Sequence, residues 1–76
     1  MLTSEQVRAA RAMLRITRRD LASAAGVSSE TVRRIERATG PISAMATTVE
    51  RITQAIESRG VRFTDGDRPG VTFTKG

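Results

Sequence analysis

Apolar residues recur along this chain first at helical spacing and then, near its end, at strand spacing. Neighbours three or four residues apart lie on one face of a helix, so each such stripe predicts a helix with one buried side. Four stripes follow one another: Val7, Ala10 and Leu14; Leu21, Ala22 and Ala25; Val32 and Ile35; and Met45, Val49, Ile52 and Ile56. The pattern therefore predicts a mainly helical fold, with four helices in residues 4–59.

Polar and small residues indicate where the first two helices begin and end. Thr3 or Ser4 can begin the first helix, which we expect to run to about Arg15. Thr17 can cap the second helix, because its hydroxyl oxygen can accept a hydrogen bond from a free amide of the first turn. Gly26 ends that helix, since glycine adopts the left-handed backbone angles of a tight turn at little steric cost.

The third and fourth helices have similar boundary signals. Ser28 or Ser29 can cap a third helix that runs through Arg37. The connection 38–41 contains glycine and proline, which predicts that it is not helical. A longer helix follows over residues 43–59, and the glycine after it ends the helical part of the chain.

The last sixteen residues change from helical to alternating spacing. Val61 and Phe63 alternate with polar residues, and Val71 and Phe73 do the same, which predicts two strands. The turn-forming residues 65–70 between them predict a β-hairpin with a wide loop. Because an isolated hairpin is marginally stable in water, it must pack on the helices, pair with a second copy or remain partly mobile. We expect Phe63 and Phe73 to be hairpin core or dimer contacts rather than platforms on which bases stack.

Length and composition restrict the kinds of function. The 76 residues predict one domain, 1–76, with a helical core over 4–59 and a hairpin tail over 60–76. Thirteen basic residues, all but one of them arginine, outnumber eight acidic ones and give a net charge of +5, which favours polyanionic partners. Cysteine and histidine are absent, which removes the usual nucleophiles and metal ligands, so we expect no enzyme, no metal site and no cofactor.

The sequence shows neither a targeting segment nor a membrane segment. Arg8, Arg11 and Arg15 interrupt every apolar run near the N-terminus, so no signal peptide is predicted. No stretch approaches the roughly 20 apolar residues that a membrane span requires. We therefore predict a cytoplasmic location and no membrane partner.

Residues 17–36, TRRDLASAAGVSSETVRRIE, combine two short capped helices, the small Ala22 and a glycine turn, which is the pattern of a helix-turn-helix unit. Residues 4–59 resemble the phage lambda repressor and Cro-like helix-turn-helix domains, also called the XRE family. The matching elements are Leu21-Ala22, Gly26-Val27-Ser28, Val32, Ile35-Glu36 and the long helix after Pro41. The Gly-Val-x-Phe tail resembles the ending of a subgroup of small bacterial regulators. The resemblance implies a four-helix lambda-repressor-like domain with a C-terminal β-hairpin.

The resemblance also implies that the helix from Ser28 to about Arg37 enters the major groove of double-stranded DNA. The implied base-reading residues are Ser29, Glu30 and Arg34, with Thr31 and Arg33 as additions. Arg34 can bond to both acceptors of guanine, and Thr31 can offer a methyl group to thymine. Glu30 can accept from cytosine, or it can instead stabilise the helix start through the dipole. The implied phosphate contacts are Arg15, Thr17, Arg18, Arg19, Ser28 and Arg37.

Several positions have structural roles or depart from the family pattern. Arg11 and Glu36 lie where many relatives have an ion pair between helices, and we expect that pair here rather than a catalytic role. Arg18 replaces the usual glutamine and adds charge at a position that contacts the DNA backbone. Arg15 and Ala38 each replace a common glycine, so we expect the turn after the first helix and the loop after the third to differ from those of relatives.

Together these features predict a sequence-specific DNA-binding transcriptional regulator, and a repressor in particular because the chain has no room for a ligand or activation domain. One recognition helix per chain predicts a homodimer on a two-fold symmetric site, with half-sites about 34 to 36 Å apart. The hairpin and the exposed side of the last helix are the candidate interfaces. The alternative is a helix-turn-helix scaffold that binds a protein partner through the last helix or the hairpin, as an antiactivator or antitoxin.

Overall fold

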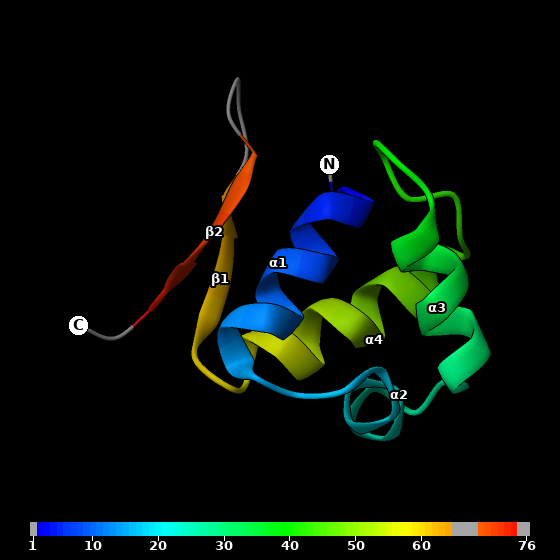
Figure 1. Cartoon of the computed structure of the whole chain (residues 1–76), viewed down its shortest axis with the longest axis horizontal. Helices are drawn as coiled ribbons and strands as arrows, with labels where there is room; N and C mark the ends of the chain where they lie inside the picture. Colours follow the sequence, from blue (N-terminus) through cyan, green and yellow to red (C-terminus); the bar gives the residue numbers. More distant parts are fainter. Residues whose placement is uncertain (1, 65–68, 75–76) are drawn as a thin grey trace.

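Four helices are followed by a two-stranded hairpin (Figure 1). A computed structural model describes residues 2–64 and 69–74, so most of the predicted hairpin loop lies outside the described residues. The elements are α1 (Ser4–Leu14), α2 (Arg18–Ala25), α3 (Ser29–Arg37), α4 (Ala46–Glu57), β1 (Val61–Thr64) and β2 (Gly70–Phe73). The hairpin lies on one side of α1 and α4, and α3 lies on the other. The predicted mainly helical fold with a C-terminal hairpin is confirmed.

The apolar stripes of the four helices meet in one core. Its buried side chains come from every helix and from the first strand: Val7, Ala10, Leu21, Ala22, Ala25, Val32, Ile35, Ile52, Ala55, Ile56 and Val61. Leu14 packs against this core and is partly buried. Met45 is 73% exposed and precedes α4 instead of lying within it. The assignment of Met45 to the apolar stripe of the last helix is therefore wrong.

The last helix is shorter than predicted at both ends, and backbone contacts hold the chain extended before its start. A short antiparallel bridge pairs Thr3 with Pro41, and the Ile42 N–H donates to Leu2 O at 3.1 Å. Residues held in this extended pairing cannot make helical hydrogen bonds. The helix begins at Ala46, after Met45, whose backbone is still extended with φ −61° and ψ 142°. The prediction that the connection after α3 is not helical is confirmed, and the connection is longer than expected.

Capping boxes begin the first two helices. Thr3, rather than Ser4, is the N-cap of α1: its Oγ1 accepts from Gln6 N–H at 3.1 Å, while Gln6 Oε1 accepts from Thr3 N–H at 2.9 Å. Thr17 and Asp20 exchange the same two hydrogen bonds at 3.0 Å each. The bond from the Thr17 backbone N–H is the main reason that the pKa of Asp20 lies below its ordinary value of 3.8.

The turn after α1 has a left-handed residue although it contains no glycine. Arg15, with φ 57° and ψ 41°, ends the helix, and its N–H donates to Ala12 O at 3.1 Å. The expectation that this turn is altered by the loss of glycine is therefore wrong for its backbone, because Arg15 adopts the conformation that glycine favours there. Ala38 differs: it is extended, with φ −78° and ψ −179°, so α3 ends without a left-handed cap.

The hairpin packs on the helices, which is one of the three options left open by the sequence. β1 and β2 pair antiparallel, with Val61 opposite Phe73 and Thr64 opposite Gly70. Val61 is fully buried in the core. Gln6 on α1 holds the other end of the hairpin, because its Nε2 donates to Thr64 O at 2.8 Å and to Gly70 O at 2.9 Å. The hairpin is thus attached to the helices by both apolar packing and hydrogen bonds.

Candidate nucleic-acid interface

The helices α2 and α3 meet at a tight turn that begins at Gly26. This glycine is left-handed, with φ 72° and ψ 33°. The Val27 N–H donates to Ala22 O at 3.0 Å, and the Val27 side chain packs half-buried against the core. Ser28 then caps α3: its Oγ accepts from Thr31 N–H at 3.1 Å, and the two hydroxyl oxygens lie 2.9 Å apart. These contacts fix the direction in which α3 leaves α2.

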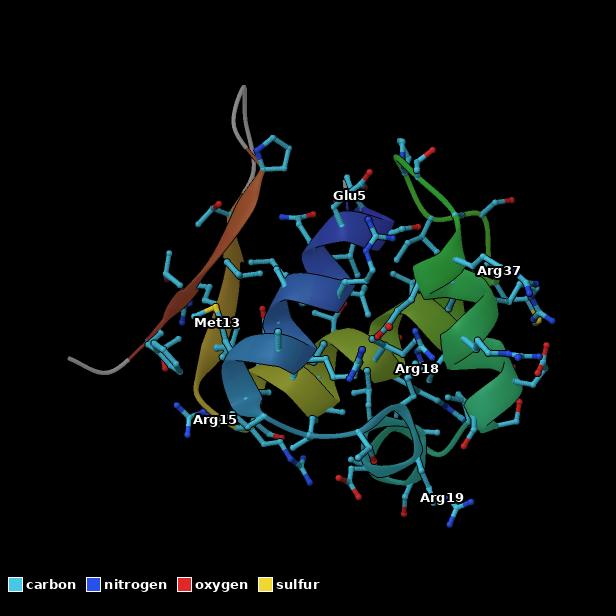
Figure 2. The ribbon with its side chains drawn as sticks, viewed as in Figure 1. Glu5, Met13, Arg15, Arg18, Arg19 and Arg37 are labelled. Atoms are coloured by element: carbon cyan, nitrogen blue, oxygen red, sulfur yellow. The ribbon has the colours of Figure 1, made fainter. Side chains whose placement is uncertain are left out.

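Helix α3 has an apolar inner face and a polar outer face. Val32 and Ile35 are buried against the other helices. The exposed residues of α3 are Ser29, Glu30, Arg33, Arg34 and Arg37. Figure 2 shows Arg37 on the side of α3 that faces away from the rest of the molecule. Every predicted base-reading residue except the half-buried Thr31 therefore has an exposed side chain on one helix.

The inner side of α3 carries a buried carboxylate that is bound by arginines from two other helices. The Glu36 side chain is fully buried, and Arg11 on α1 donates through Nε to Oε2 at 2.8 Å and through Nη2 to Oε1 at 3.1 Å. Arg18 on α2 donates through Nε to the same Oε1 at 3.1 Å. The expected pair between Arg11 and Glu36 is present, and Arg18 is a second partner. One carboxylate thus joins α1, α2 and α3.

Arginines of α1 also bind backbone carbonyls near the helix ends. Arg11 Nη1 donates to Ile16 O at 3.0 Å, so every nitrogen of this guanidinium has an acceptor. Arg8 Nη1 donates to Glu36 O and, at 3.0 Å, to Ala38 O. A positive charge at the C-terminal end of a helix is also favourable for the helix dipole. These bonds hold the C-terminal end of α3 against α1.

This arrangement of helices agrees with a known protein family. A family model described as helix-turn-helix matches residues 7–57, which is two thirds of the chain. The chain belongs to this family. The match supports membership of the XRE, or lambda repressor-like, kind, whose domains are DNA-binding regulators and not enzymes. No curated protein matches the sequence.

In this helix-turn-helix protein, the exposed arginines of α3 differ in their surroundings. Arg33 Nη2 lies 2.8 Å from Glu30 Oε1, and both side chains are more than half exposed. Arg34 and Arg37 form no ion pair with any residue in the described ranges. Their guanidinium groups are therefore available to a ligand without the loss of an internal ion pair.

The predicted phosphate contacts of the helix-turn-helix protein do not all lie together. Thr17 caps α2, and Arg19 projects outward from the same end of that helix (Figure 2). Arg18 lies between α2 and α3, where its Nε is bound to the buried carboxylate while the side chain remains 48% exposed. Arg15 lies on the side of the molecule nearer the hairpin, well away from Arg37. Of these residues, Arg18 is thus in direct contact with α3, whereas Arg15 lies apart from Arg37.

Sequence reasoning missed three contacts that position this site: the bond from Arg18 to Glu36, the bonds from Arg8 to the end of α3, and the bonds from Gln6 to the hairpin. Thr3 and Gln6 have the spacing of a capping box, so the sequence indicated the hydrogen bonds between these two residues. It did not indicate the bonds from Gln6 to the hairpin. The arginine contacts have no such signal, since they depend on how α1, α2 and α3 cross.

Membrane-spanning helices and metal-binding clusters are both absent from the described residues. Within 2–64 and 69–74, no helix combines the length and the apolar character that a membrane crossing requires. The same ranges contain no group of three acidic, histidine or cysteine side chains placed to hold a metal ion.

Proposed function

We propose that this helix-turn-helix protein is a transcriptional repressor that binds a specific sequence of double-stranded DNA through the outer face of α3. The observation that carries the proposal is the division of the arginines. Arg11 and Arg18 are bound to a buried carboxylate, whereas Arg34 and Arg37 extend from α3 without an acidic partner among the described residues. Free guanidinium groups on an exposed recognition helix suit guanine edges and phosphates.

Arg34 is the central residue of the proposed base readout, because its two donor groups match the O6 and N7 acceptors of guanine. Ser29 and Thr31 lie in the first turn of the same helix and offer a hydroxyl and a methyl group. Glu30 can accept from cytosine N4 only if it releases Arg33, which then becomes free for a further base contact. Each good bidentate contact contributes about 1 to 3 kcal/mol of discrimination between bases.

The proposed phosphate contacts come from two helices. They are Ser28 and Arg37 on α3, and Thr17, Arg18 and Arg19 at the start of α2. Because only the Nε of Arg18 bonds to Glu36, both of its Nη groups can bind a phosphate while the ion pair persists. Arg15 lies nearer the hairpin, apart from Arg37, so its proposed phosphate contact is separate from that of Arg37.

Repression follows from occupancy, since a protein bound across a promoter excludes the polymerase. We propose a homodimer on a two-fold symmetric operator with half-sites about 34 to 36 Å apart, acting in the cytoplasm. Expression of a reporter gene tests the sign of regulation. Transcription from a promoter that contains the preferred site should fall when the protein is present, and a rise would contradict repression.

Selection of binding sites from a random DNA library tests the proposed DNA recognition. The expected result is an enriched motif with two-fold symmetry, together with a mobility shift of the DNA upstream of the protein's own gene. Binding should weaken steeply with salt, with a slope that reports the number of phosphates neutralised. If no sequence is enriched and no DNA is retarded at low salt, the proposal fails, and the protein-binding alternative replaces it.

A further inference from the structure

The apolar face of the hairpin extends beyond the helices that cover it. Val61, Phe63, Val71 and Phe73 share this face, because Val61 is opposite Phe73 and Phe63 is opposite Val71. Val61 is fully buried, Phe63 and Val71 are half-buried, and Phe73 is 58% exposed. Burial therefore decreases from β1 to β2, and a large aromatic side chain is left in water at the outer strand.

The outer edge of β2 presents the backbone N–H and C=O groups of Val71 and Phe73. The Thr74 N–H donates to Gly60 O at 2.8 Å, so Thr74 and, two residues earlier, Thr72 are the positions that exchange hydrogen bonds with the β1 side. Val71 and Phe73 then direct their backbone groups outward, and no described residue outside the hairpin bonds to them. The strand has no charged side chain, proline or bulge to protect this edge.

We propose that β2 pairs antiparallel with β2 of a second copy, which joins the two hairpins into one four-stranded sheet. The two-fold axis passes between the two Thr72 residues, so Val71 of each copy lies opposite Phe73 of the other and exchanges both backbone hydrogen bonds with it. Directly opposite side chains lie on the same face, so Val71 of one copy covers the exposed Phe73 of the other. The pairing is self-complementary, as a two-fold interface requires.

This geometry also suits the proposed function. Two strands that pair antiparallel side by side are related by an axis perpendicular to the sheet, so the helices of both copies lie on the same side of it. In each copy α3 lies across α1 and α4 from the hairpin (Figure 1). The dimer therefore directs both recognition helices to the same side, as a two-fold symmetric operator requires. The inference names the interface of the proposed dimer, and the pairing itself does not require DNA.

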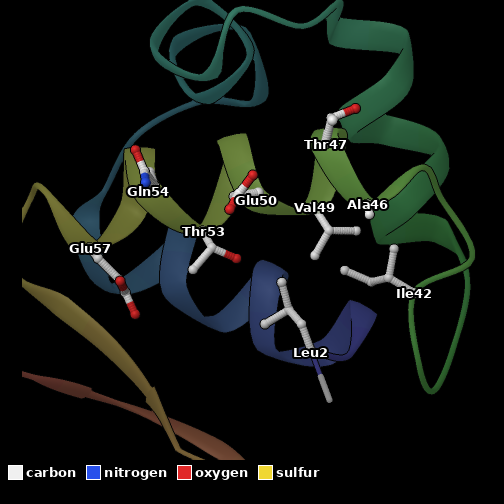
Figure 3. Close-up of a pocket in the computed structure, with 9 residues that line it drawn as sticks. All are labelled: Leu2, Ile42, Ala46, Thr47, Val49, Glu50, Thr53, Gln54 and Glu57. Atoms are coloured by element: carbon white, nitrogen blue, oxygen red, sulfur yellow. The ribbon is translucent and has the colours of Figure 1, made fainter.

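A groove along α4 is the main competing surface (Figure 3), with a volume of 660 Å³. Leu2, Ile42 and Val49 provide its apolar part, Glu50 and Glu57 are acidic, and none of its described lining residues is basic. A two-fold contact through this groove would bring the carboxylates of one copy against those of the other, and like charges repel. β2 carries no charge, so the charge pattern favours β2 as the surface for a second copy.

Cross-linking through one introduced cysteine tests the register. The chain has no native cysteine, so Thr72→Cys provides a unique thiol. In the proposed register the two Cα atoms at position 72 lie about 4.5 Å apart, within the span of a disulfide, and added diamide should convert most of the variant to covalent dimer. The matched variant Thr74→Cys places the two Cα atoms roughly 14 Å apart and should stay monomeric on a denaturing gel. Equal cross-linking of both variants, or none at position 72, overturns the register.

Sedimentation equilibrium without DNA tests the interface itself. Phe73→Lys removes the exposed aromatic side chain and places a charge on the edge, so the dimer Kd should rise at least about tenfold. Met45→Lys makes the same kind of change at another exposed apolar residue, and its Kd should stay within about twofold of wild type. Equal effects of the two variants, or a monomeric wild type, overturn the inference. A dimer that selects no DNA site would instead contradict only the proposed function.

Discussion

Two ion pairs of α3 have the same nitrogen–oxygen distance, 2.8 Å, but differ in burial. The pair between Arg11 and Glu36 joins α1 to α3, and its side chains are 24% and 0% exposed. The pair between Arg33 and Glu30 lies within α3, and its side chains are 55% and 58% exposed. The distance between the charged atoms therefore does not determine how much an ion pair contributes to the free energy of unfolding. A buried carboxylate that loses its partner cannot recover its hydration, whereas an exposed one can.

This difference gives arginines on neighbouring helices different tasks. Arg11 and Arg18 are bound to the buried carboxylate of Glu36. Without these two arginines, the ionic contacts that join α1 and α2 to α3 would be lost. Arg33 can leave Glu30 for a nucleic acid at little cost, because water replaces the lost contact on both sides. Arg11 is thus purely structural, because each of its guanidinium nitrogens has an acceptor, whereas Arg18 keeps its two Nη groups for a ligand and Arg33 keeps its whole guanidinium group.

Glu36→Gln should have the largest effect on stability. The amide keeps the size of the side chain but cannot neutralise Arg11 and Arg18. We therefore expect the free energy of unfolding to fall by about 3 kcal/mol. This value is near the lower limit for a broken buried pair, because both arginines are partly exposed. Urea denaturation followed by circular dichroism measures this change. A loss below about 1 kcal/mol would mean that burial does not distinguish the two pairs.

Glu30→Gln is the matched change in the exposed pair and should cost about 0 to 1 kcal/mol of stability. It should also free Arg33, so that affinity for random duplex DNA rises and the salt dependence steepens by up to about one phosphate contact. Fluorescence anisotropy at several salt concentrations measures both quantities. A stability loss as large as that of Glu36→Gln would remove the contrast on which this account depends.

Acidification should have the smallest effect. Backbone N–H donors hold the pKa of Asp20 below 3.8, mainly through Thr17, and hold the pKa of Glu5 below 4.5, first through its own N–H and then through Gly40. The unfolded chain therefore binds more protons, so this stabilisation is present above those values and is lost as the pH falls through the lower pKa values of the folded state. In Asp20→Asn, the fall in Tm between neutral pH and about pH 3 should be smaller than in wild type. An equal fall would show that the Asp20 cap does not titrate with folding.

Most of the fold could be predicted from the sequence because its signals are local. The stripe of Val7 and Ala10, the Thr17 cap and the turn at Gly26 each depend on residues a few positions apart, and the structure has all three. Met45 continued the apolar spacing of the last helix and so was placed in it wrongly. The spacing contained no information about the bridge between Thr3 and Pro41, which keeps the preceding segment extended.

The candidate site could be predicted only in part. That Arg34 would be exposed followed from its place outside the apolar stripe of α3, and the structure has it exposed. The partner of Arg18 could not be predicted, because the bond to Glu36 depends on the angle between α2 and α3. The outer edge of β2 was likewise beyond prediction, since alternation indicates which side chains share a face but not which strand is covered by helices.

The central claim is that the outer face of α3 recognises DNA sequence through Arg34, and one comparison of binding constants tests it most directly. The Kd of Arg34→Ala should be measured against the selected operator and against random duplex at the same salt concentration, with Arg37→Ala as the phosphate-contact control. We expect operator binding by Arg34→Ala to weaken about 10- to 100-fold, with a much smaller loss on random DNA. Arg37→Ala should lose affinity about equally on both. Equal losses for Arg34→Ala on the two DNAs would contradict the claim and reduce Arg34 to a phosphate contact.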